Sequence, residues 1–159
     1  MSDATLTVET DLEKGFSEII RPDDRKGYEG YLVDADNLIQ FVNGLKNELG
    51  YDYLASLTGV DYLPEGKMEV VYHMRKSTGG SPLVFKVQVP RENPVIPSLV
   101  PVFPGADFQE REVWDLYGIK FENHPDLRRI FFASQHFRVK SCLVDFWRVG
   151  VIRMPYSNK

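Results

Sequence analysis

Two neighbouring stretches, residues 68–76 and 83–89, alternate apolar and polar side chains, and this pattern constrains the fold most strongly. Alternation with a period of two is typical of a strand with one buried and one wet face, and we place Lys86 on the wet face. The glycine-containing loop 77–81 is too short for a crossover connection. The two strands must therefore be antiparallel neighbours.

Residues 36–49 carry the clearest helical pattern, because apolar side chains recur on one face of a helix. These side chains are Leu38, Phe41, Val42, Leu45 and Leu49. Asp34 or Asp36 would cap this helix, and Gly50 would end it. Gly44, inside the helix, indicates close packing on a sheet.

Residues 107–117 form a second predicted helix of about three turns. Asp107 suits the N-cap, and Glu110 three residues later can reach back to it, as in a capping box. Gly118 suits the left-handed residue that ends a helix.

These elements predict an α+β fold: a two-layer sandwich of a mainly antiparallel sheet with helices on one face. Further strands are expected at 31–33 and 51–63. We expect a single domain over residues 1–130, with its core at about 30–130. Residues 131–159 would form an irregular C-terminal extension that is basic and apolar.

Glu110 lies in the middle of the apolar side of the second helix. An unpaired buried carboxylate costs several kcal/mol, so it needs a donor. Arg128 and Arg129 follow closely, and a guanidinium group fits a carboxylate bidentately. We therefore predict an acid-and-arginine latch, in which this arginine pair neutralises Glu110 and Glu112.

Residues 93–104 contain four prolines among twelve residues. Proline fixes φ and restricts the preceding residue, so the segment must be stiff and extended or form a single turn. It is either a linker packed across the domain's own core or a docking ridge for a partner. We favour the linker.

The charge distribution is uneven along the chain. The formal net charge is −4, which does not favour nucleic acid as a partner. Residues 128–159 hold 7 of the 19 Lys and Arg but only 1 of the 23 Asp and Glu, so a basic tail follows an acidic body. Either tail and body attract each other, or the tail docks on an acidic partner surface.

Cys142 is the only cysteine, which excludes an internal disulfide and a multi-cysteine metal site. The acidic N-terminal stretch lacks the apolar centre of a signal peptide. The most apolar run, residues 94–104, is too short and too rich in proline to span a bilayer. We expect any membrane association to occur through partners.

Catalytic chemistry finds little support in the sequence. The three histidines are scattered, and no glycine-rich phosphate loop is present, so nucleotide binding is unsupported. Glu110, Glu112 and Asp115 could form a metal or acid–base cluster. Arg111 and the pair 128–129 supply compensating charge, which favours a structural ion-pair network.

The run from Glu110 to Ile119 and the run from His124 to Ile130 together resemble the signature of one family of NADH-quinone oxidoreductase subunits, the 30 kDa-type subunit of the C type. The resemblance is carried by Glu110, Arg111, Glu112, Asp115, Gly118, His124, Pro125, Leu127, Arg128 and Arg129. It extends upstream through residues 93–98 and covers roughly residues 30–130. The family belongs to the peripheral arm of respiratory complex I, and related domains occur in the photosynthetic NDH complex and in membrane-bound hydrogenases.

The resemblance implies a scaffolding subunit with no catalytic, cofactor-binding or metal-binding residues of its own. FMN, iron–sulfur clusters and quinone would lie in partner subunits. This chain would brace the quinone-site subunit of the D type and the iron–sulfur subunits of the I and B types. The complex would pass electrons from NADH to quinone and translocate protons at the cytoplasmic face of the plasma membrane. The signature residues would be structural and docking residues.

Beyond Ile130 the sequence departs from the family, which usually continues with a Gly-His-Pro-Leu-Arg-Lys-Asp type motif. The apolar tail either packs on the body or is covered by a partner; an altered or frameshifted end is another explanation. Two other functions stay open. One is the equivalent subunit of a membrane-bound hydrogenase or of a ferredoxin- or F420-linked relative. The other is a stand-alone small-molecule enzyme with Glu110 or Glu112 as its general base.

Overall fold

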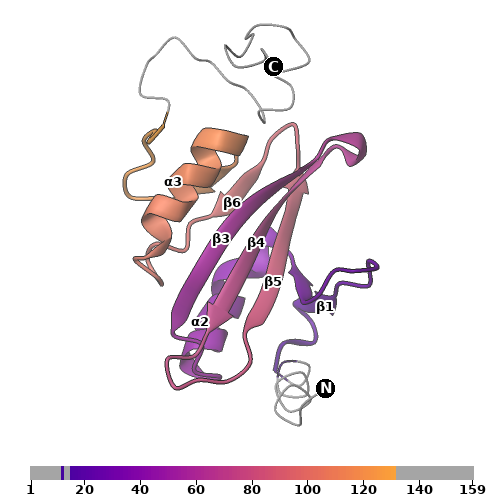
Figure 1. Cartoon of the computed structure of the whole chain (residues 1–159), viewed down its shortest axis with the longest axis vertical. Helices are drawn as coiled ribbons and strands as arrows, with labels where there is room; N and C mark the ends of the chain where they lie inside the picture. Colours follow the sequence, from indigo (N-terminus) through magenta and orange to yellow (C-terminus); the bar gives the residue numbers. More distant parts are fainter. Residues whose placement is uncertain (1–11, 13–14, 132–159) are drawn as a thin grey trace, which may run out of the picture.

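The computed structural model describes residue 12 and residues 15–131. The described chain forms the expected α+β fold, with a sheet on one side and two helices on the other (Figure 1). Except for Phe131, the predicted C-terminal extension lies outside the described residues. Within the described part, no helix combines the length and the apolar character needed to cross a membrane.

The main sheet has five strands in the order β1-β2-β5-β4-β3. The strands are β1 (Ile20–Pro22), β2 (Tyr31–Val33), β3 (Tyr53–Tyr62), β4 (Lys67–Arg75) and β5 (Leu83–Pro90). Strands β3, β4 and β5 are antiparallel neighbours, as the alternation predicts, with Tyr72 opposite both Leu57 and Phe85. Strand β2 pairs with β5 in parallel, and a short 3₁₀ turn, η2 (Leu63–Glu65), joins β3 to β4.

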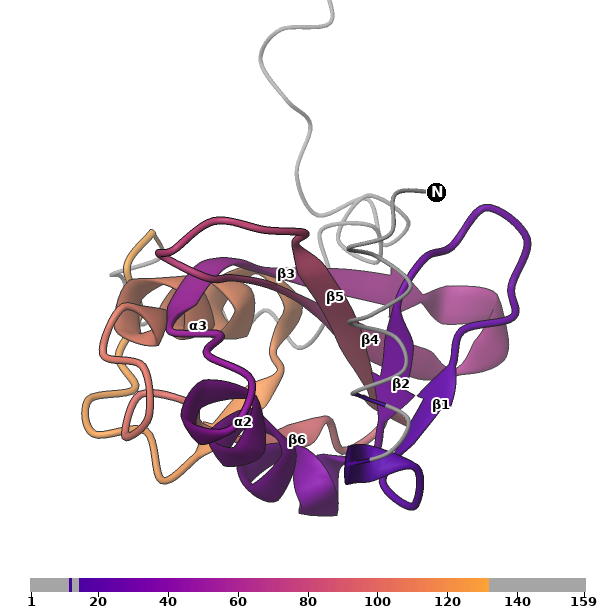
Figure 2. The ribbon, with the colours of Figure 1, turned by 90° about the horizontal axis from the view of Figure 1, so that it is seen from below.

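Both main helices cover the same face of this sheet, which confirms the two-layer prediction. Helix α2 (Leu38–Asn47) follows the 3₁₀ turn η1 (Ala35–Asn37), and α3 (Ala106–Tyr117) comes near the end of the described chain. Figure 2 shows the two helices on one side of β3, β4 and β5. Phe41 of α2 meets the edge of Phe85 on β5 at a ring distance of 5.2 Å. The stripe of α2 thus packs into the core, as expected.

Gly44 does not serve the purpose that the sequence indicates. A Cβ atom at this position would lie 2.4 Å from the Phe16 ring, so Gly44 allows Phe16 rather than the sheet to approach α2. Phe16 also packs edge-on against Phe41, with ring centroids 5.3 Å apart. The segment before β1 therefore covers a part of α2 that we expected to pack against the sheet.

The sequence places Lys86 on a solvent-exposed face of the sheet, and this prediction is wrong. Lys86 is buried, and its Nζ lies 2.5 Å from a carboxylate oxygen of Asp23. Arg25 pairs with both Asp23 and Glu69 of β4. The loop between β1 and β2 folds over this part of the sheet, and its charges satisfy the polar groups that alternation places there.

A second, two-stranded sheet positions the ends of α3. Strand β6 (Val95–Pro97) pairs in parallel with β7 (Lys120–Glu122). The proline-containing segment packs across the domain's own core, as favoured above, because Ile96, Leu99 and Phe103 are all buried. This packing places residues 98–104 directly before α3.

Candidate functional site around helix α3

Helix α3 begins one residue earlier than predicted, and the expected capping box does not form. The N-cap is Gly105, with no side-chain cap hydrogen bond. The N–H of Asp107 bonds the carbonyl of Pro104 at 3.3 Å, so the preceding turn already supplies its acceptor. The carboxylate of Glu110 is consequently not needed at the helix start and lies elsewhere.

The other end of α3 is as the sequence predicts. Gly118 has φ of 78°, and its N–H bonds the carbonyl of Trp114 at 2.9 Å. This left-handed conformation is one that side-chain-bearing residues rarely adopt. The last turn packs on β3, where a Cβ at Gly59 would lie 2.8 Å from the Tyr117 ring. Close contact with the sheet therefore fixes the position of the helix.

Glu110 is completely buried, but arginine is not its partner. One carboxylate oxygen accepts a hydrogen bond from the hydroxyl of Ser98, and the other accepts from the backbone N–H of Leu99, both at 2.6 Å. The predicted neutralisation of Glu110 by Arg128 and Arg129 is wrong. The residues directly after β6 supply neutral donors to this carboxylate, and the pattern of side chains on a helix cannot show which segment covers it.

His124 approaches the same carboxylate from the turn after β7. Its side chain is fully buried, and Nε2 lies 3.9 Å from Glu110 Oε2 and 3.6 Å from Asp107 Oδ1. The Asp126 N–H donates to Nδ1 at 3.0 Å, which places the proton of the neutral ring on Nε2. From there Nε2 can donate to the Asp107 carbonyl oxygen, 3.3 Å away.

Burial raises the pKa of Glu110 to about 7, against the lowering effect of its hydrogen bonds from Ser98 and Leu99, and the charge of Asp107 adds to the rise. Tyr72 of β4 is also buried, and burial, followed by the charge of Glu110, holds the pKa of its phenol well above the usual range. Its hydroxyl has no hydrogen-bond partner among the described residues. The interior beside α3 is therefore polar but poor in compensating positive charge.

Asp115 is the acid that the arginine pair actually reaches. Its Oδ1 lies 3.2 Å from Nη1 of Arg129, and its Oδ2 accepts hydrogen bonds from the N–H groups of Ile130 and Phe131 at 3.1 and 2.7 Å. An acid-and-arginine contact therefore joins the two predicted segments, but its acid is Asp115 and not Glu110 or Glu112. It fixes residues 129–131 against α3.

Arg128 and Glu112 take no part in that contact. The Arg128 guanidinium is 72% exposed and pairs with Asp126, an arrangement that contributes little in water. Its carbonyl instead accepts a hydrogen bond from Nε of Arg111 at 3.1 Å. Glu112 is exposed, and within the described residues it has no ion-pair partner, so its predicted neutralisation is also wrong.

The remaining signature residues are structural neighbours of this site. Leu127 packs partly against the core, whereas Pro125 is exposed. Neither Ser98 nor Tyr72 was assigned to this site from the sequence, although Ser98 ends the upstream run 93–98 that resembles the family. A serine inside the otherwise apolar run 95–103 is the signal that could have identified Ser98, because a buried hydroxyl requires a partner.

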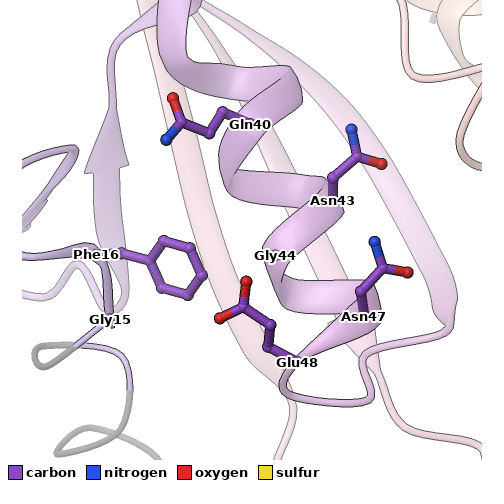
Figure 3. A pocket seen from close by; sticks show the side chains of 7 residues that line it. All are labelled: Gly15, Phe16, Gln40, Asn43, Gly44, Asn47 and Glu48. Carbon is purple, nitrogen blue, oxygen red and sulfur yellow. The ribbon is translucent and has the colours of Figure 1, made fainter.

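Among the described residues, no group of three or more His, Cys, Asp or Glu is arranged to hold a metal ion. Glu110 as a general base would be shielded from any substrate by residues 98–104. An open hollow lies elsewhere, beside α2, lined by polar side chains such as Asn43 and Asn47 (Figure 3). Of the three acids for which we predict an ion-pair network, only Asp115 pairs with an arginine of the pair 128–129, whereas Glu110 holds its segment through neutral donors.

Comparison with known proteins identifies a family that this chain matches. Residues 31–143 match the model of the family described as "Respiratory-chain NADH dehydrogenase, 30 Kd subunit". The C-type subunit of the NADH-quinone oxidoreductase of Moorella thermoacetica is 43% identical over 62% of this chain and 67% of its own length. The C-type subunit of the F(420)H(2) dehydrogenase of Methanosarcina mazei is 41% identical over 60% of this chain and 61% of its own length. The chain thus spans about two thirds or less of these relatives.

A solved structure extends the similarity to three dimensions. It is described as "Nqo5 of the trypsin-resistant fragment (1-134)", and it superposes with a TM-score of 0.65 and 31% sequence identity. The match covers 76% of this chain and 98% of that fragment.

Proposed function

This chain belongs to the family of the 30 kDa subunit of respiratory-chain NADH dehydrogenase, and from that premise we propose that it is a non-catalytic subunit of the peripheral arm of a complex I-type enzyme. Its role is to brace neighbouring subunits while electrons pass from NADH to quinone. The proposal extends the family assignment to activity and assembly.

The proposal rests on the hydrogen bonds that the carboxylates of α3 make to neighbouring segments of the chain. Glu110 holds residues 98 and 99, and Asp115 holds residues 129–131. A carboxylate engaged by buried backbone N–H groups shapes the chain and cannot serve as a freely accessible acid or base. The signature side chains therefore support a scaffold.

In this proposal the redox groups belong to partners. FMN, the iron–sulfur clusters and the quinone site are carried by other subunits, and this chain contacts the quinone-site subunit of the D type and the iron–sulfur subunits of the I and B types. It lies on the cytoplasmic face of the plasma membrane and reaches the membrane through those subunits. Proton translocation is a property of the whole complex.

In a second candidate function the chain is again a scaffold subunit, but the complex oxidises an electron donor other than NADH. The match to the Methanosarcina F(420)H(2) dehydrogenase subunit favours a non-NADH relative of complex I. The two candidates differ only in what the partner subunits oxidise, because the acids of α3 serve the same structural purpose in both.

One experiment addresses both candidates. The tagged full-length chain is expressed in its own host, and complexes are purified from detergent-solubilised membranes. We expect cluster-bearing subunits to co-purify and the eluate to reduce a quinone with NADH. Quinone reduction with reduced F420 alone would select the second candidate. Recovery of the free chain without partners from the solubilised membranes would refute both.

A further inference from the structure

Residues 98–104 form a short covering segment, here called the strap, between β6 and α3. The buried side chains of Leu99 and Phe103 anchor it in the core. Lys46 of α2 donates to the carbonyl of Val102 at 2.9 Å. The strap lies over Glu110 and gives that carboxylate both of its hydrogen-bond donors, from Ser98 and the Leu99 N–H.

The charge on Glu110 is poorly compensated while the strap is closed. Among the described residues, the basic side chain within 4 Å of its carboxylate is His124, at 3.9 Å, whose Nδ1 accepts a hydrogen bond from the Asp126 N–H. The guanidinium of Arg111 is directed to Asp107 and to the carbonyl of Arg128.

The groups around Glu110 therefore bring little positive charge to its carboxylate. Asp107 on α3 presents a buried Oδ1 atom, which makes no hydrogen bond among the described residues and lies 3.5 Å from Nη1 of Arg111. Tyr72 from β4 contributes a buried phenol, and the strap itself contributes the neutral hydroxyl of Ser98. An ionised carboxylate in such surroundings is costly, whereas a neutral one is well accommodated.

We propose that the strap is a proton-gated closure: with a proton on Glu110 it stays shut over α3, and loss of that proton to water favours its lifting. A neutral carboxyl keeps a carbonyl oxygen for the Leu99 N–H, so the closed contact survives protonation. When the strap lifts, water reaches Glu110, which then ionises readily. The state that ionises more readily gains population as the pH rises.

The expected pH range follows from the environment of Glu110. The pKa is about 7 with the strap closed and returns toward its ordinary value of 4.5 when water has access. Between these values the opening equilibrium rises by up to about tenfold per pH unit, and above them it levels off. The inference concerns this chain alone and does not depend on the proposed function.

The test is hydrogen exchange of the Leu99 amide in the full-length chain, followed by NMR from pH 5.5 to 7.5 and corrected for the intrinsic exchange rate. We expect protection to fall by up to about tenfold per pH unit. In Glu110→Gln the amide oxygen accepts from the Leu99 N–H and the NH2 group donates to the Ser98 hydroxyl, so protection should not change with pH. Glu112→Gln, an exposed acid on the same helix, should behave like the parent chain.

Two results would overturn the proposal. The first is a protection of Leu99 that is flat in the parent chain or falls equally in Glu110→Gln. The second is equal protection for Leu99 and for Val70, which lies in β4, between β5 and β3. Equal values would mean that Leu99 exchanges only through global unfolding, so that the strap has no opening of its own.

Discussion

The Asp115 carboxylate lies 3.2 Å from the Arg129 guanidinium, although the two residues are fourteen positions apart and belong to different segments. The second carboxylate oxygen binds two successive backbone N–H groups, those of Ile130 and Phe131. One buried acid on α3 therefore determines where the chain runs after β7. A contact of this kind fixes residues 129–131 against the helix.

Replacement of this acid should loosen the end of the described chain. Asp115→Ala leaves two N–H groups and a guanidinium without their acceptor, so we expect a loss of about 1–3 kcal/mol in the free energy of unfolding. Urea denaturation of the full-length chain measures this loss. Glu112→Ala removes an exposed acid three residues earlier and should change stability by less than about 0.5 kcal/mol. Equal effects of both changes would contradict the structural role of Asp115.

Glu110 should make the protein less stable as the pH rises. Its folded pKa of about 7 exceeds its unfolded value of 4.5, so the folded chain binds the extra proton between these limits. The stabilisation is fully present below pH 4.5 and is lost as the pH rises through 7, by up to about 3 kcal/mol. Glu110→Gln removes this loss and should be the more stable protein at pH 8. Urea denaturation of both proteins at pH 5 and pH 8 measures this difference. An equal loss of stability in both proteins between the two pH values would contradict the prediction.

The helices and the antiparallel strands could be predicted from the sequence because they depend on residues that are close together in the chain. The stripe of α2 and the terminal glycine at Gly118 are short-range signals, and both proved correct. The antiparallel pairing of β3, β4 and β5 followed from alternation and short connections. The parallel pairing of β2 with β5 joins segments that are distant in sequence, so it could not be predicted from a local sequence pattern.

The partners within the site were mispredicted for a related reason. A helical wheel shows that Glu110 faces the interior, but it does not show which segment lies over that face. Here the strap reaches it first and supplies Ser98, so Arg129 is left for Asp115. Lys86 was misplaced in the same way, because a loop from elsewhere in the sequence covers it.

The charged cluster on the other face of the sheet gives a prediction of opposite pH dependence. Hydrogen bonds from Arg25, followed by those from Lys86, hold the pKa of Asp23 well below its usual value of 3.8. Its stabilisation is present above that value and is lost as the pH falls. Asp23→Asn should cost about 2–4 kcal/mol at pH 7, because Lys86 stays buried without its partner.

Urea denaturation at pH 7 and at pH 3 tests this expectation, and the difference between parent and variant should shrink at the lower pH. Asp24→Asn is the matched control, since Asp24 is the next residue and is exposed. The cluster would have no stabilising role if the two variants were equally stable at pH 7.

The contact between β3 and α3 should tolerate no added methyl group. In Gly59→Ala the new Cβ would lie 2.8 Å from the Tyr117 ring and 3.1 Å from Val113, which requires the helix or the strand to shift. We expect a loss of about 1–3 kcal/mol from overpacking, measured by urea denaturation. Gly105→Ala is the control, because its Cβ meets no atom within 4 Å and its φ is −65°. That change should be neutral or slightly stabilising; a Gly59→Ala protein as stable as this control would mean that α3 does not rest on β3 at this distance.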